Sequence, residues 1–134
     1  MPAAIELQKA VFAALAGDAA LAALLGGSKI YDHAPAGVAF PYLTFGRISV
    51  FDWSVDGGAG VELLFSLNAW SKARGKSEAL AIVERTRALL HEAGLELEGH
   101  RLVNLRAERA EAGFVDDIDT HHARLSFRAV VEEG

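Results

Sequence analysis

The stretch VELLFSLNAWSKARGKSEALAIVERTRALLHEA, from Val61 to Ala93, predicts a strand followed almost directly by a helix. Over Val61–Trp70 the odd positions are apolar and the even positions mostly polar, a period of two that indicates a strand with one buried face. From Lys76 the apolar residues recur at steps of three and four, which indicates one apolar stripe along a helix. Because the polar connection between them is short, we expect the helix to pack across the sheet that contains the strand.

Length and composition predict a single domain, residues 1–134, with a packed core. Hydrophobic residues make up 51% and charged residues 23% of the chain, which is ordinary for a globular protein and too apolar for a disordered one. The Ala- and Leu-rich segment 10–25 is interrupted by Gly17 and Asp18, so it falls short of a membrane span. The amino terminus lacks the basic region of a signal peptide, and we therefore expect a cytoplasmic protein.

The charge and the absence of Cys exclude several classes of function. A chain without Cys has no disulfide, no thiolate metal site and no cysteine nucleophile. The formal net charge of -5 argues against a protein that grips nucleic acid through its phosphates. A protein that only lets DNA pass would tolerate that charge.

The rest of the chain predicts two helices and three further strands. The apolar spacing indicates a helix over residues 3–15, with Ala4, Leu7, Val11 and Leu15 on one side and with Glu6 and Lys9 turned away. Asp18 is expected to cap a short helix over 19–25, which Gly26-Gly27 ends. Alternating patterns predict strands over 42–50, 101–111 and 120–131, and Gly46 predicts a bulge in the first of these. In the second, Val103, Leu105 and Ala107 are expected to face the same way.

Two hairpins separated by a helix predict an α+β fold. We expect a two-layer sandwich with a mainly antiparallel four-stranded sheet and helices packed on one face. Residues 28–41 predict a surface connection, while residues 51–60 and 112–119 predict long projecting hairpin loops. The helix-free face is expected to carry polar and charged side chains: Glu62, Asn68, Arg106, Glu108, Arg124 and Arg128.

No motif predicts catalysis, a cofactor or a metal. His121 and His122 lie close to three aspartates, but adjacent strand residues point to opposite faces and cannot both bind one ion without distortion. The serines lack a nucleophile-elbow setting, and the glycine groups do not match a phosphate-binding loop. The Arg74–Ser77 turn at a helix start remains open as an anion site. The clustered arginines fit either a salt-bridged face or contact with a neighbouring chain's charges.

Several short motifs, taken in their order and spacing, carry a family resemblance over nearly the whole chain. They are the N-terminal Ala/Leu-rich helix, Lys29–Asp32 with Pro35, Phe40–Tyr42, Asp52–Ser54, Ala69–Ser71, Ala79–Leu90, Gly99–Val103 and Arg124–Arg128. The sequence resembles the tail-completion or tail-terminator proteins of long-tailed phages and gene transfer agents, which include head-to-tail joining proteins. The resemblance implies a non-enzymatic virion protein. It also implies a homohexameric ring that caps the head-proximal end of the tail tube, ends tube polymerisation and joins the tail to the neck.

The predicted site is therefore a protein interface. The resemblance implies three partners, namely further copies of the chain, a tail tube protein and a neck or stopper protein, with DNA passing through the ring without sequence-specific binding and with no membrane involved. Assembly would begin in the cytoplasm and end in the particle's tail or neck. The interface candidates are Phe51, Asp52, Trp53, Val55, Arg106, Phe114, Asp116, Arg124 and Arg128.

Two alternatives stay open. The aromatic side chains between Phe51 and Val55 would be costly to expose, so they either contact another chain or fold back on their own sheet. The other class of function is a small ligand- or anion-binding regulatory α+β domain, with a pocket between helix layer and sheet.

Overall fold

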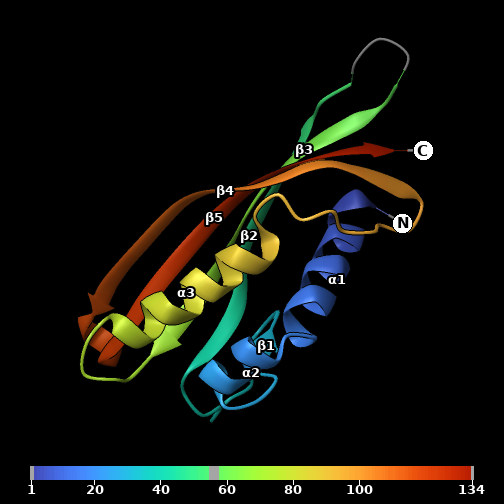
Figure 1. Cartoon of the computed structure of the whole chain (residues 1–134). Coiled ribbons are helices and arrows are strands. Elements are labelled where there is room, and N and C mark those ends of the chain that lie inside the picture. Colours follow the sequence, from blue (N-terminus) through green and yellow to red (C-terminus); the bar gives the residue numbers. More distant parts are fainter. Residues whose placement is uncertain (1, 55–57, 134) are drawn as a thin grey trace.

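The computed structural model describes residues 2–54 and 58–133, in which three α-helices lie on one face of a five-stranded sheet (Figure 1). The helices are α1 (Ala3–Ala16), α2 (Ala19–Leu25) and α3 (Ser77–Leu90). The strands are β1 (Ile30–Tyr31), β2 (Tyr42–Asp52), β3 (Gly60–Ser71), β4 (His100–Val115) and β5 (Thr120–Glu133), and the 3-10 helix η1 (Asp116–Ile118) joins the last two. This arrangement confirms the predicted α+β class.

The strand order is β1-β2-β3-β5-β4, with every pair antiparallel except β1 and β2. The sequence predicted four strands and a surface connection over residues 28–41. That connection instead contains β1, in which buried Ile30 pairs with Leu43. Two residues are too few to show a period of two, so the sequence pattern could not predict β1.

The second hairpin also differs from its prediction. Residues 112–119 were expected to project as a loop, but β4 continues to Val115 and β5 begins at Thr120. Gly113 does not interrupt the strand because its backbone stays in register with His122. Only a tight turn of four residues, 116–119, is left between the two long strands.

The core lies between α3 and the face of β3 and β5 that the opening stretch predicts. Leu63, Leu67 and Ala69 on β3 are buried, and the ring of Phe65 stacks on Phe127 of β5 at 5.0 Å between centroids. The predicted stripe of α3 is buried against them: Ala79, Ile82, Val83, Thr86 and Leu90. The strand-then-helix prediction is confirmed.

Bulges decide which side chains reach this core. The register of β2 and β3 shifts between Phe45 and Ile48, as Gly46 predicted. β4 shifts twice, and the first shift, between Leu102 and Asn104, leaves Val103 37% exposed while Leu102 packs on the core. The prediction that Val103 shares the face of Leu105 is wrong, because a bulge breaks the period of two.

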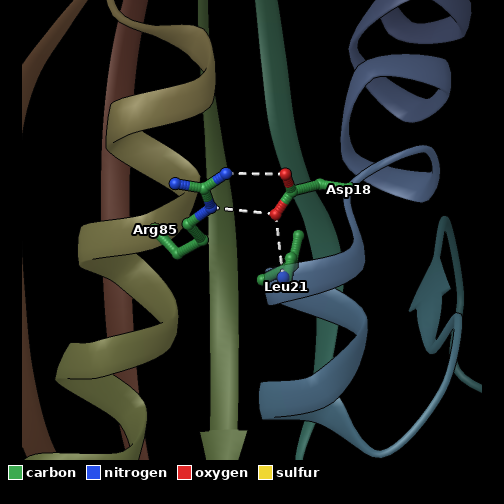
Figure 2. Close-up of polar contacts among 3 residues, drawn as sticks. All are labelled: Asp18, Leu21 and Arg85. Atoms are coloured by element: carbon green, nitrogen blue, oxygen red, sulfur yellow. Dashed lines mark hydrogen bonds and ion pairs between the residues drawn. The ribbon is translucent and has the colours of Figure 1, made fainter.

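The two N-terminal helices meet at Asp18, which also binds α3 (Figure 2). Asp18 accepts a hydrogen bond from Leu21 N at 2.8 Å, confirming the predicted cap, and its two oxygens accept from Arg85 Nε at 2.8 Å and Nη2 at 2.6 Å. The bond from Arg85, followed by the bond from Leu21, lowers the pKa of Asp18 to about 2. One carboxylate therefore caps α2 and fastens it to α3.

The first helix is buried more widely than its pattern indicated. Glu6, predicted to turn away from the core, is buried and pairs with Lys9 Nζ at 3.3 Å. Because Glu6 lies next to Leu7, the methylene groups of its side chain pack with the buried side of α1. The exposed Lys9, one helical turn later, supplies the opposite charge. Within the described ranges, no single helix is long and apolar enough to cross a membrane, although α1 and α2 together, bent by 82°, reach that length and composition.

Candidate assembly interface

The helix-free face of the sheet brings together four of the predicted interface residues. Residues directly opposite each other in antiparallel strands point to the same face. Arg106 pairs with Arg128, and Arg124 pairs with Asn68, while Phe51 pairs with Glu62. The register therefore places Phe51 and the three arginines on the face that the helices leave uncovered.

The predicted interface residues around the end of β2 differ in exposure and in the face to which they belong. Phe51 is 47% exposed. Asp52 belongs to the opposite, helix-side face and accepts a hydrogen bond from Ser54 Oγ at 2.8 Å. Trp53 is half-buried, with its ring against Gly60 and its N donating to Gly60 O at 2.9 Å. Val55 lies outside the described residues.

The remaining two candidates, Phe114 and Asp116, lie at the far end of the sheet. Phe114 is 45% exposed and meets the ring of His121 edge to face at 4.8 Å. Asp116 is exposed in η1. The β2–β3 hairpin and the β4–β5 turn lie at opposite ends of the sheet (Figure 1), so the candidates form two separate surfaces.

The arginines of the helix-free face divide into paired and unpaired groups. Arg128 forms an ion pair with Glu62, Arg101 with Glu132, and Arg109 with Glu111. Arg106 and Arg124 form no ion pair with any residue in the described ranges. Part of this face is therefore salt-bridged. Among the described residues, Arg106 and Arg124 have no carboxylate partner, and Arg124 Nε donates to Asn68 Oδ1 at 3.5 Å.

A polar cluster that the sequence did not predict lies next to these arginines. The ring of Trp70 stacks on His122 at 4.3 Å, and Trp70 Nε1 donates to Thr44 Oγ1 at 3.0 Å. His122 Nε2 shares a hydrogen bond of 2.7 Å with Asn68 Oδ1. Burial, and then the charge of Arg124, lower the pKa of His122, while Glu111 acts in the opposite direction. Asn68 and Trp70 of β3 and His122 of β5 occupy even-numbered positions on one face of the sheet. The sequence pattern predicted only that this face is polar.

The alternatives based on small ligands find less support. No cluster of three or more metal-ligating side chains exists among the described residues. The first turn of α3 already holds the carboxylate of Glu78, which accepts from Ser71 Oγ at 2.6 Å, so an anion at the Arg74–Ser77 turn would meet a like charge. The cavity between α1 and the sheet, beside Phe65, measures only about 10 Å³.

An open groove of about 500 Å³ lies beside α1. Two exposed side chains of α1, Ile5 and Phe12, line it together with Phe45 of β2. Its remaining walls are polar: Gln8, Lys9 and Asp32. The groove thus exposes apolar surface at the β1–β2 edge of the sheet.

Comparison with known proteins identifies the family of this chain. The family model described as Tail completion protein gp17 matches residues 9–132. A chain of the solved structure "Virion of native gene transfer agent (GTA) particle" is 38% identical, covers 96% of this chain and 96% of its own length, and superimposes with a TM-score of 0.89. The search of curated proteins returned no match. The family resemblance is confirmed, and the chain belongs to the Tail completion protein gp17 family.

Proposed function

We propose that this chain is a structural virion protein that forms a homohexameric ring at the head-proximal end of a tail tube. In this role it ends tube polymerisation and joins the tail to the neck. The observation that carries the proposal is the similarity, over almost the entire length of both chains, to a chain found in a gene transfer agent virion. Family membership supports the coarser part, a structural role in a tail.

The distribution of exposed apolar side chains fits a ring. A closed ring larger than a dimer needs two different surfaces on each subunit, one meeting the other on its neighbour. Phe51 lies at one end of the sheet and Phe114 at the other, and both rings are close to half exposed. We propose that these ends, with Asp52, Trp53 and Asp116, contact neighbouring copies, the tail tube protein or the neck protein.

The helix-free face completes the proposed contacts. Arg106, Arg124 and Arg128 would meet acidic groups of an adjoining chain, where desolvation makes such pairs more specific than exposed ones. DNA would pass through the ring without sequence-specific contacts, a role compatible with the net charge of -5. The chain would fold in the cytoplasm and end in the particle, and no catalytic step is required of it.

Deleting the gene in a particle-producing cell tests this function. Electron microscopy of the lysate should show heads and tails that are unjoined, or tails of irregular length, and a wild-type copy should restore joined particles. Mass spectrometry of purified wild-type particles should detect the protein. Normal particles after deletion would contradict the proposal.

A further inference from the structure

Two stretches of strand edge are open in this sheet. Along Ile48–Asp52, β2 pairs only with β3, and along Arg109–Val115, β4 pairs only with β5, as far as the described residues extend. An open edge presents a row of unpaired backbone donors and acceptors to any extended chain that approaches. Natural sheets usually close such edges.

Other parts of both edges are closed by specific contacts. On the β2 side, β1 pairs with Leu43 and Thr44, and Leu43 N donates to Lys29 O at 3.0 Å. On the β4 side, Leu105 O accepts from Glu92 N at 2.6 Å and Ala107 N donates to His91 Nδ1 at 2.9 Å. Bulges follow Leu102 and Ala107. The two open stretches therefore differ from the parts of the same edges that are paired, covered or bulged.

The open stretch of β4 has few of the usual protections, and its two charged residues, Arg109 and Glu111, form an ion pair with each other. Between Arg109 and Val115 it contains no Lys, no Pro and no bulge, and three of its side chains are small, those of Ala110, Ala112 and Gly113. A Cβ placed on Gly113 would meet no atom within 4 Å. The backbone of this stretch is unpaired on its outer side within the described part of the chain and carries three small residues, which suits it to accept a further strand.

The two open stretches complement each other in direction and shape. Because β2 and β4 end an alternating series of four strands, they run in opposite directions, so copies of like orientation would pair antiparallel. On the helix side of the sheet, Val50 would then face Ala112 when Ile48 faces Phe114. Phe114 and the adjacent Ile118, which is 50% exposed, would reach the groove lined by Ile5, Phe12 and Phe45.

The charges at the ends of the two stretches also match. Arg47 precedes the open part of β2 and Asp52 ends it, whereas Arg109 begins the open part of β4 and Asp116 follows it. Antiparallel pairing brings Arg47 near Asp116 at one end of the contact, while parallel pairing would bring Arg47 near Arg109. Neither Arg47 nor Asp116 forms an ion pair with a described residue of its own chain.

We infer that the Arg109–Val115 edge of one copy adds to the Ile48–Asp52 edge of a second copy, with Phe114 and Ile118 filling the groove beside α1. The occupant of the groove is thus the β4–β5 turn of the same protein. This inference rests on the proposed ring and names the contact that builds it. Main-chain hydrogen bonds supply affinity, and the groove supplies specificity.

Cysteine cross-linking in assembled particles tests the contact, since the natural chain has no Cys. Val50→Cys is combined in turn with Ala110→Cys, Ala112→Cys and Phe114→Cys, which allows for a shift of register, and purified particles are oxidised. At least one pair should give a ladder of covalent multimers that collapses on reduction. The control pair, Val50→Cys with Leu80→Cys on the exposed side of α3, should stay monomeric.

The possible results distinguish a failure of the proposed edge contact from a failure of the proposed function. Particles that contain the protein but give no cross-link with any of the three pairs overturn the edge contact and leave the ring role standing. Cross-linked dimers from Ala112→Cys alone overturn it too, because they mean that β4 pairs with its own symmetry mate. Absence of the protein from wild-type particles overturns the proposed function itself.

A second variant tests the same edge without relying on register. Gly113→Lys places a charged side chain on the open edge where there is room for it, so the melting temperature should stay near wild type while joined particles are lost. Gly94→Lys, at another glycine with free space around it, is the matched control and should leave joining intact. Wild-type numbers of joined particles with Gly113→Lys would overturn the edge contact.

Discussion

At the scale of single residues, His122 makes the stability of this protein depend on pH. Its pKa lies below the ordinary value of 6.5 in the folded chain, because burial and Arg124 disfavour the charged ring. As pH falls below that value, the unfolded chain takes up the proton first, so the free energy of unfolding declines until the lowered pKa is passed. Well above pH 7 the histidine is neutral in both states and contributes almost no slope.

Chemical denaturation between pH 8 and 5 measures the effect. His122→Gln keeps a hydrogen-bonding side chain but cannot titrate, so its free energy of unfolding should vary less with pH than that of the wild type. The difference between the two proteins, rather than either curve, isolates His122 from the other four histidines. Parallel curves would show that His122 is not the titrating group.

Gly46 lies at a position in β2 where any larger residue would clash with neighbouring side chains. A Cβ built there would lie 2.2 Å from Ser66 Oγ and 2.9 Å from Asn68 Nδ2, where the register of β2 shifts. Gly46→Ala should lower the free energy of unfolding by about 1–3 kcal/mol, the usual cost of overpacking. Adding Ser66→Ala removes the nearest atom and should recover part of the loss, as a double-mutant cycle in urea would show. Additive effects would contradict this account.

At the scale of elements, two neighbouring leucines of β3 differ in burial because they point to opposite faces of the sheet. Leu63 is fully buried on the helix side and Leu64 is 37% exposed on the other face. Leu63→Ala should lower the free energy of unfolding by about 2–5 kcal/mol, because it leaves a cavity in the core. Leu64→Ala should change it by only about 0.5 kcal/mol. Equal losses in denaturant unfolding would mean that the assigned face of β3 is wrong.

The Asp18–Arg85 pair ties two helices to a third. Asp18→Asn keeps a good capping residue but loses the ion pair, so it should lower the melting temperature at pH 7, and Asp18→Ala should lower it further. The pKa of Asp18 is held at about 2, against 3.8 ordinarily, so its contribution is complete above pH 4 and is lost as pH falls toward 2. The gap between wild type and Asp18→Asn should therefore close on acidification, as thermal melts across that range would reveal. A constant gap would exclude the charge as its cause.

At the scale of the whole molecule, Phe51 tests whether its exposed face serves assembly. Because the ring is 47% exposed, Phe51→Ser should leave the melting temperature within a few degrees of wild type. Burial against another chain would make the same change costly in the particle, so joined particles should become scarce. Electron microscopy of particles made with each variant counts them, and Leu80→Ser on the exposed side of α3 is the control. Normal joining with Phe51→Ser would remove this residue from the interface.

The core was predictable because burial there follows local periodicity. The period of two in β3 and the stripe of α3 each fixed which side chains turn inward, and both faces were found buried together. The Asp18 cap was predictable for the same reason, since its hydrogen-bond partner lies three residues away. The bulges of β4 were not, because the extra residue shows only when the neighbouring strand is in place.

The candidate interface was predictable only as a set of residue types. The sequence showed aromatic residues in the expected loops and a cluster of arginines. It did not show that Arg128 forms an ion pair while Arg106 forms none with the described residues. Pairing depends on which strands are neighbours, and the order β3-β5-β4 joins residues far apart in the chain.

The sequence by itself determined the α+β class and the packing faces of β3 and α3. Those properties follow from side-chain spacing along one helix or strand, which is a local quantity. The order and spacing of its short motifs carried the family resemblance. Only the tertiary structure decided the fifth strand, the Trp70–His122 cluster, the groove beside α1 and the open stretches of β2 and β4. Each of these arises where segments remote in sequence meet, and strand order and register, not composition, determine what they place side by side.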